Sequence, residues 1–288
     1  MYKQKRVLAI HDISCVGKCS LTVALPIISA AGVECSVLPT AVLSTHTGGF
    51  KDYTFNDLSN DLLPICRHWK SLGLHFDAIY TGFLAGPEQV DTICEIIDML
   101  AGKDTVVVVD PVMGDNGRLY SSFKDNFPKK MIELCKKADI ITPNLTEACM
   151  MLGEKYTEGL SENKEAVEGI LAALCENMRS DVVLTGVQRK VSLLGAAWRT
   201  VNGKKGVYCS RRIDGMYHGT GDVFASLLVA CMIRGIPLPC AVETAVDFTE
   251  EAVRATKEMG TDPRYGVDFE SLLADFALTV KKLCESFK

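Results

Sequence analysis

Short apolar runs alternate with longer stretches in which apolar residues recur every three or four positions along most of the chain. The short runs are typical of strands and the longer stretches of helices. The clearest strand is residues 106–109, four consecutive valines, because β-branched residues without polar alternation indicate burial on both faces of a parallel sheet. The alternation of the two patterns predicts an α/β protein built on a mostly parallel sheet.

The remaining elements follow the same alternation. A strand at residues 7–10 precedes a helix that opens at Gly17 and ends at Gly32, with a kink predicted at Pro26. After a strand at residues 35–38, residues 39–50 are predicted to form a ligand-binding loop, because such loops follow strand C-termini in open α/β sheets. Further strands are predicted at residues 78–81, 139–142 and 182–186, and further helices at residues 57–69, 90–100, 124–137, 163–178, 240–258 and 267–285.

Residues 190–212 break the alternation. Two strand-like runs, residues 191–198 and 206–209, flank the dipeptide Asn202-Gly203, which is a strong hairpin signal. We therefore expect an antiparallel hairpin at one edge of the sheet. Because no repeat, linker or low-complexity tract interrupts the chain, residues 1–288 are predicted to form a single domain.

Composition excludes several functional classes. A net charge of −5 argues against a general binder of nucleic acid or of anionic membranes. No apolar run approaches the roughly 18 residues of a membrane span, and residues 1–6 run straight into a strand without a secretory signal, so a cytoplasmic protein is expected. The 12 cysteines form no Cys-x-x-Cys pair, and buried thiols are the favoured interpretation.

The sequence Gly219-Thr220-Gly221-Asp222 predicts a glycine turn that opens directly into a buried helix. Converging backbone N–H groups and the positive end of a helix dipole form an anion site there. Asp222 has two interpretations. It is either a carboxylate in a favourable first helical turn, or the base that receives a proton from a hydroxyl during phosphoryl transfer. We expect it to be ionised, because the helix terminus and nearby amides favour the carboxylate.

Polar side chains also follow several predicted strands. Asp110 and Asp115 come just after the valine strand, where a carboxylate pair suits magnesium and phosphate. Asn144 and Glu147 follow the next strand, and their spacing equally predicts a helix capping box. A histidine in the predicted loop, His46, is a ligand contact or a surface residue.

In chain order these landmarks resemble those of the ribokinase-like superfamily, and specifically its vitamin B6 kinases (the pyridoxal, pyridoxine and pyridoxamine kinases). The resemblance covers essentially the whole length. The matching motifs are the Gly17 turn with its proline-containing helix, His46-Thr47-Gly48, Thr81-Gly82-Phe83, Asp110-Pro111-Val112-Met113-Gly114-Asp115, Ile141-Thr142-Pro143-Asn144 with Glu147, and Gly219-Thr220-Gly221-Asp222.

The resemblance implies a three-layer α/β/α fold, and ATP-dependent phosphorylation of the hydroxymethyl group of a substituted pyridine with Mg²⁺. It implies a homodimer as a reasonable assembly. It also assigns roles to residues: Asp222 as base; Gly219, Thr220 and Gly221 as anion hole; Asp110, Asn144 and Thr185 near the nucleotide; Asp115 and Glu147 near the metal; Asp12, His46, Thr47 and Phe83 around the ring.

Three departures leave ring specificity open: the loop between Ile10 and Gly17 is shorter than in the long-form pyridoxal kinases, Asp12 stands where serine is expected in many of these kinases, and Lys18 stands where asparagine is expected. One alternative is a kinase of the same fold acting on hydroxymethylpyrimidine, a thiamine precursor. Another is a non-catalytic binder of pyridoxal phosphate, in which Lys18 could form a Schiff base. The preferred vitamer and the need for a monovalent cation stay open at this point.

Overall fold

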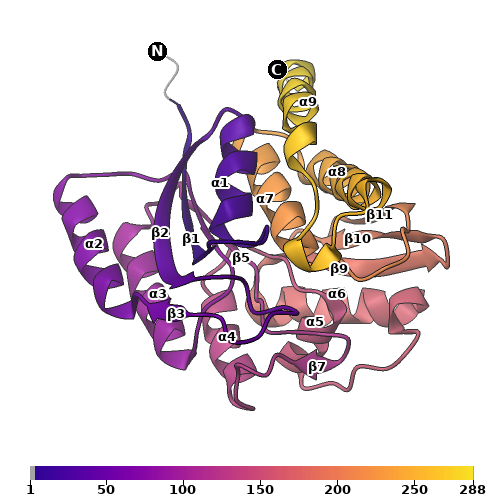
Figure 1. Ribbon diagram of the computed structural model, residues 1–288, viewed down its shortest axis with the longest axis horizontal. Coiled ribbons are helices and arrows are strands. Elements are labelled where there is room, and N and C mark those ends of the chain that lie inside the picture. Colours follow the sequence, from indigo (N-terminus) through magenta and orange to yellow (C-terminus); the bar gives the residue numbers. More distant parts are fainter. Residues whose placement is uncertain (1–3, 288) are drawn as a thin grey trace.

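The computed structural model describes residues 4–287, and residues 1–3 and 288 of the predicted domain lie outside this range. Within it, nine strands form one sheet in the order β11-β10-β9-β8-β5-β4-β1-β2-β3 (Figure 1). The strands are β1 (Arg6–Ser14), β2 (Glu34–Leu43), β3 (Phe55–Asp57), β4 (Ala78–Thr81), β5 (Val106–Val109), β8 (Ile140–Ile141), β9 (Asp181–Lys190), β10 (Leu193–Arg199) and β11 (Lys205–Arg211). A separate small hairpin pairs β6 (Gly114–Asp115) with β7 (Arg118–Leu119).

Helices cover both faces of the sheet. On one face α1 (Leu21–Ala30), α7 (Thr220–Ile233), α8 (Leu238–Met259) and α9 (Leu273–Ser286) pack together. The other face carries α2 (Ser59–Ser71), α3 (Pro87–Leu100), α4 (Phe127–Cys135), α5 (Leu145–Leu152) and α6 (Lys164–Met178), as Figure 1 shows. Each layer has its own buried apolar cluster against the sheet. The predicted three-layer α/β/α architecture is confirmed.

The sheet is parallel from β2 to β9 and antiparallel at both edges. The predicted hairpin at Asn202-Gly203 is confirmed as β10–β11, which pairs antiparallel next to β9. At the opposite edge, β3 pairs antiparallel with β2, which the sequence pattern did not indicate. The chain leaves β1 toward β2 on one side and returns to β4 on the other. This reversal between neighbouring parallel strands is where open α/β sheets bind ligands.

Several predicted boundaries near the first strand were wrong. The predicted loop at residues 39–50 begins only after Leu43, because β2 continues in register beside β1 through its polar end. The first helix begins at Leu21 instead of Gly17, and it runs through Pro26. Leu25, one of its apolar positions, is 41% exposed, so the buried stripe is narrower than its spacing indicated.

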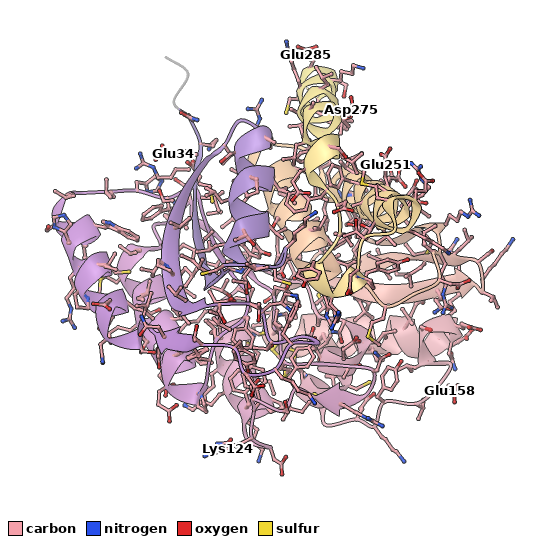
Figure 2. The ribbon with its side chains drawn as sticks, in the orientation of Figure 1. Glu34, Lys124, Glu158, Glu251, Asp275 and Glu285 are labelled. Carbon is pink, nitrogen blue, oxygen red and sulfur yellow. The ribbon has the colours of Figure 1, made fainter. Side chains whose placement is uncertain are left out.

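The periphery of the molecule is acidic in several places, in keeping with the net negative charge. Glu34, Glu251 and Asp275 project outward from β2, α8 and α9 (Figure 2). All 12 cysteines are free thiols. Five are buried as predicted, Cys15 is exposed, and the other six, Cys94 among them, are half-buried, so the predicted burial of the thiols holds only in part. Within residues 4–287, none of the helices combines the length and the apolar character that a membrane crossing requires.

Candidate active site

Three predicted nucleotide contacts lie on adjacent strands at the carboxyl edge of the sheet. Asp110 directly follows β5, Asn144 follows β8, and Thr185 lies in β9. Asn144 and Thr185 form a parallel bridge, and the Thr185 N–H donates to the Pro143 carbonyl at 2.9 Å. The structure therefore brings these residues to one edge, because parallel strands place their carboxyl ends together.

Asn144 and Glu147 form the capping box of α5. The Asn144 side chain accepts from the Glu147 N–H at 3.0 Å, and the Glu147 Oε2 accepts from the Asn144 N–H at 2.9 Å. The other oxygen, Oε1, accepts from the Met113 N–H at 3.0 Å. Burial, together with the charge of Asp110, raises the pKa of Glu147 well above its usual range. The predicted capping box of Asn144 and Glu147 is therefore confirmed. Glu147 also binds the loop after β5 through the Met113 N–H.

Asp115 lies in the small β6–β7 hairpin and is exposed. Its carboxylate accepts from the Asn116 N–H at 2.8 Å and from the Asn116 side-chain amide at 3.0 Å. In the part of the chain that the structure describes, no three His, Cys, Asp or Glu side chains converge into a ready metal site. Mg²⁺, however, commonly binds through one or two carboxylates plus substrate phosphates and water. Asp110, whose Oδ1 accepts from the Thr142 hydroxyl at 3.1 Å, fits that donor set through its second oxygen.

The predicted glycine turn and helix are confirmed. Gly219 is the N-cap of α7 with φ 76°, and no side chain caps this helix. A Cβ on Gly219 would lie 2.1 Å from the Lys18 carbonyl oxygen, so glycine is required by both backbone conformation and space. The N–H groups of Thr220, Gly221 and Asp222 therefore stand uncapped at the positive end of the helix dipole, which is the arrangement that binds an anion.

The carboxyl group of Asp222 does not behave as the sequence led us to expect. Burial raises its pKa to about 7, a backbone N–H at Ser20 lowers it, and the charge of Asp12 raises it further. Desolvation therefore outweighs the helix terminus, so less of the carboxyl group is ionised at neutral pH than the sequence led us to expect. Burial and the charge of Asp222 likewise raise the pKa of Asp110 to about 8. The charges of the two carboxyl groups are therefore close enough to interact.

Asp12 is buried at the end of β1, where it ties the strand to the start of α1. Its carboxylate accepts from the Ser14 hydroxyl at 3.0 Å and from the Ser20 hydroxyl at 2.5 Å. Burial raises the pKa of Asp12, and these two hydrogen bonds lower it. The sequence reading missed both serines, although Ser20 immediately precedes the helix in a position typical of an N-cap.

His46 is buried, so the surface interpretation was wrong. Its Nδ1 accepts from the Gly48 N–H at 3.1 Å, and its Nε2 therefore carries the proton that it donates to the Arg264 carbonyl at 2.6 Å. Burial lowers the pKa of His46. Its ring lies 5.0 Å from Phe50 and 5.3 Å from His218, measured between centroids, so the loop after β2 reaches the residue preceding the anion hole.

The other two predicted ring contacts differ in environment. Thr47 is half-buried beside His46. Phe83 follows β4 and packs against the core on the α3–α4 face, with its ring 5.5 Å from Phe123. A cavity of about 410 Å³ between α6 and the β9–β11 strands includes Trp198 and Val207, and it is lined by none of the predicted site residues.

Lys18 is held by the protein itself. Its ammonium group pairs with Asp268 and, at 2.9 Å, with Glu270. Desolvation lowers the pKa of Lys18, but the two carboxylates outweigh it and the net pKa is raised. A paired ammonium is a poor nucleophile, so this arrangement speaks against the Schiff base.

Comparisons with known proteins agree with this geometry. Residues 25–266, most of the chain, match the family described as phosphomethylpyrimidine kinase. A candidate phosphomethylpyrimidine kinase of Bacteroides thetaiotaomicron, crystallised with pyridoxal, is 35% identical with a TM-score of 0.89, over 95% of this chain and 96% of that one. The pyridoxal kinase of Lactobacillus plantarum is 32% identical with a TM-score of 0.87, over 97% and 99% of the two chains.

Curated sequences give the same grouping. A candidate pyridoxal kinase of Schizosaccharomyces pombe is 26% identical over 273 residues, which is 90% of this chain and 83% of that protein. Four other relatives are longer than the match, which spans about half of their length or less. One of them, a thiamine biosynthetic bifunctional enzyme of Oryza sativa, is covered over 41% of its length.

Proposed function

The chain belongs to the phosphomethylpyrimidine kinase family, and we propose that within this family it is a vitamin B6 kinase of the ribokinase-like superfamily. It transfers the γ-phosphoryl group of ATP to the 5′-hydroxymethyl group of pyridoxal, pyridoxine or pyridoxamine. The observation that carries this proposal is the position of Asp222 beside the uncapped N–H groups of α7, at the carboxyl edge of the sheet. A protein that only stored pyridoxal phosphate would gain nothing from a carboxylate there.

Asp222 acts as the base. The substrate hydroxyl oxygen forms a bond to the γ-phosphorus, the bond to the β-phosphate oxygen breaks, and the hydroxyl proton passes to the Asp222 carboxylate. With a pKa of about 7, this carboxylate is a stronger base than an exposed aspartate and is still largely ionised above neutral pH. Its desolvated position supports this role, because proton acceptance relieves an unfavourable buried charge.

The N–H groups at Thr220, Gly221 and Asp222 stabilise the negative charge on the moving phosphoryl group. Asp110, Asn144 and Thr185 contact the nucleotide side of the site, at the ends of three adjacent strands. Bound Mg²⁺ would supply charge neutralisation to the phosphates, and Asp110 is the best-placed residue to hold it. Glu147 holds the loop after β5 in place by accepting from the Met113 N–H. The exposed Asp115 adds a second carboxylate to this loop, on the metal side of the site.

The substrate ring lies on the side of Asp12, His46, Thr47 and Phe83. His46, with its proton fixed on Nε2, shapes the loop through Gly48, and Asp12 orients Ser20 and Ser14 toward the start of α1. Phe83 packs against the core beside the loop after β4 and limits the space for the ring on that side. The whole chain works as one kinase domain, a cytoplasmic homodimer.

A side-by-side assay tests the proposal. Purified protein is incubated with ATP and Mg²⁺ and with pyridoxal, pyridoxine, pyridoxamine or hydroxymethylpyrimidine, and the phosphorylated product is measured. We expect turnover of at least one B6 vitamer with a kcat/KM above that for the pyrimidine. A clear preference for hydroxymethylpyrimidine would reassign the ring specificity, and no turnover of any of the four would refute the kinase. Sedimentation of the same preparation tests the homodimer.

A further inference from the structure

The segment of residues 261–270, which lies between α8 and α9, contacts three loops of the site. The Arg264 carbonyl accepts from His46 Nε2–H at 2.6 Å, in the loop after β2. The Tyr265 carbonyl accepts from the Lys18 N–H at 2.9 Å, in the loop before α1. His218, next to the anion hole, donates its N–H to the Pro263 carbonyl at 3.4 Å. One segment therefore contacts the ring side and the phosphate side of the site.

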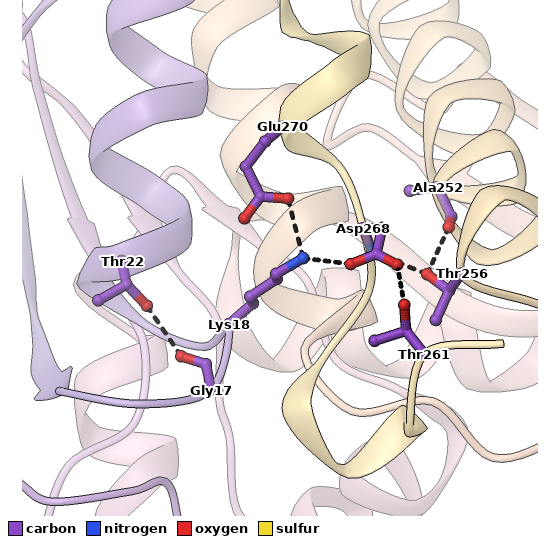
Figure 3. A network of polar contacts seen from close by, with 8 residues as sticks. All are labelled: Gly17, Lys18, Thr22, Ala252, Thr256, Thr261, Asp268 and Glu270. Atoms are coloured by element: carbon purple, nitrogen blue, oxygen red, sulfur yellow. Dashed lines mark hydrogen bonds and ion pairs between the residues drawn. The ribbon is translucent and has the colours of Figure 1, made fainter. Parts of the chain in front are cut away.

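The Lys18 side chain fixes the far end of this segment. Figure 3 shows its ammonium group between Asp268 and Glu270. Asp268 is itself anchored, since its Oδ2 accepts from the Thr261 hydroxyl at 2.5 Å and its N–H donates to the Thr256 hydroxyl of α8 at 2.7 Å. The Lys18 and Asp268 side chains are only 26% and 14% exposed, so this pair is better shielded from water than an ordinary surface pair.

The Lys18 backbone lies between Gly219 and Gly266 and is close to both. Its carbonyl oxygen lies 2.1 Å from the position of a Cβ on Gly219 and 2.8 Å from that of a Cβ on Gly266. The backbone carbonyl of Lys18 therefore lies close to the N-cap of α7, with no room for a side chain between them. Two residues further on, Ser20 donates its hydroxyl to Asp12. A shift of Lys18 would move the anion hole and the Asp12 side of the site together.

We propose that Lys18 is a positioning residue for phosphoryl transfer, and that its ion pair with Asp268 sets Gly219 and the N-terminus of α7 against the substrate. This inference rests on the proposed kinase activity. An anion hole that is displaced by a fraction of an ångström still binds phosphate, but its N–H groups no longer point at the charge that develops in the transition state. The loss should therefore fall on kcat and leave KM nearly unchanged.

The variants are Lys18→Met, Lys18→Arg, Asp268→Asn and the Lys18→Met/Asp268→Asn double variant. A matched control is Lys137→Met, since the Lys137–Asp98 pair is 2.6 Å long, its lysine side chain is 31% exposed, and it joins α3 to the end of α4, away from the site. We expect Lys18→Met to lower kcat by about tenfold or more with KM within about threefold, while Lys137→Met stays at wild-type turnover. Lys18→Arg should recover most of the loss, and the double variant should be no worse than Lys18→Met alone.

Hydrogen exchange gives a readout that does not depend on activity. In Lys18→Met the amide of Val223, which bonds the Gly219 carbonyl at 3.0 Å, should exchange faster than in Lys137→Met. The proposal would be overturned if Lys18→Met changed neither kcat nor the exchange rate of the Val223 amide. It would also be overturned if Lys18→Met and Lys137→Met lost activity and Tm to the same extent. A wild-type protein that phosphorylates none of the four acceptors would instead refute the kinase, and the exchange comparison would still decide whether Lys18 positions α7.

Discussion

Replacing Asp222 by asparagine separates its role as a base from its role in the fold. The variant keeps the size of the side chain and removes its charge. A positioned base contributes about 10²- to 10⁴-fold, so kcat should fall by that factor while KM for ATP changes little. The matched control is Asp214→Asn, a carboxylate 90% exposed a few residues before the anion hole, which should keep wild-type kcat.

The pH dependence follows from the raised pKa of Asp222. With a pKa of about 7, roughly a tenth of the free protein has the ionised base at pH 6 and roughly nine-tenths at pH 8. The kcat/KM of the wild type should therefore rise about tenfold between these values and level off above pH 8. The Asp222→Asn variant should lack this rise.

The same raised pKa predicts how stability depends on pH. An ion-paired aspartate makes the folded protein more stable as pH rises, whereas Asp222 should make it less stable. Because the folded pKa is raised from 3.8 to about 7, the folded state loses stability as pH rises between those values. The full loss is up to about 4 kcal/mol, at 1.36 kcal/mol per pKa unit. Asp222→Asn should then melt a few degrees above the wild type at pH 8, with no gain at pH 4.

Steady-state kinetics from pH 5.5 to 9 and thermal melts at pH 4 and pH 8 test both halves. The reasoning would be refuted by an Asp222→Asn variant with near-normal kcat. A flat wild-type kcat/KM profile across pH 6–8 would refute the assigned pKa, and an equal Tm for the two proteins at pH 8 would refute the argument that burial of the charge opposes folding.

Three further predictions concern the surroundings of the site. Gly219→Ala should lower kcat at least tenfold and destabilise the fold by about 1–3 kcal/mol, measured by turnover and urea unfolding, because φ 76° and the contact with Lys18 both oppose a Cβ. Glu147→Ala should lose about 2–4 kcal/mol of unfolding free energy in urea, since it removes the capping box and leaves the Met113 N–H unbonded. Burial lowers the pKa of the buried β1 residue His11 from 6.5 to about 3, so its contribution to stability is present above pH 6.5 and is lost as pH falls. Between pH 7 and pH 5 the unfolding free energy of the wild type should therefore fall by about 2 kcal/mol more than that of His11→Gln.

The sequence predicted most of the central sheet, because most of its buried strands carry their own local signal, whereas the edge strand β3 carries none. Val106–Val109 and Ala78–Thr81 have the predicted bounds, and Asn202-Gly203 marked the antiparallel hairpin. Local chemistry also indicated the uncapped start of α7, since only glycine tolerates the conformation of residue 219. Features that a few neighbouring residues determine were therefore readable from the chain.

Features that depend on distant partners were not readable. The ionisation of Asp222 depends on burial among several elements, which its own helix turn does not reveal. The bounds of β2 depend on its register with β1, so its polar end looked like a loop. Lys18 and Asp268 are 250 residues apart, and their pairing leaves no local pattern in the sequence. Where the local sequence fits two interpretations equally well, long-range contacts of this kind decide between them.

The electrostatics of the site also bear on the choice between a kinase and a binder. The charge of Asp12 raises the pKa of Asp222, and the charge of Asp222 raises that of Asp110, so the buried carboxyl groups of Asp12 and Asp110 and the half-buried one of Asp222 oppose one another's ionisation. Such an arrangement lowers the stability of the folded protein at neutral pH. A protein that only binds pyridoxal phosphate would be more stable with amides at these positions, and its anionic ligand would bind more tightly. A kinase needs a carboxylate at this position, because the acceptor alcohol must lose its proton as the phosphoryl group is transferred to it. The unfavourable carboxylate cluster is thus an argument for catalysis that is independent of sequence similarity.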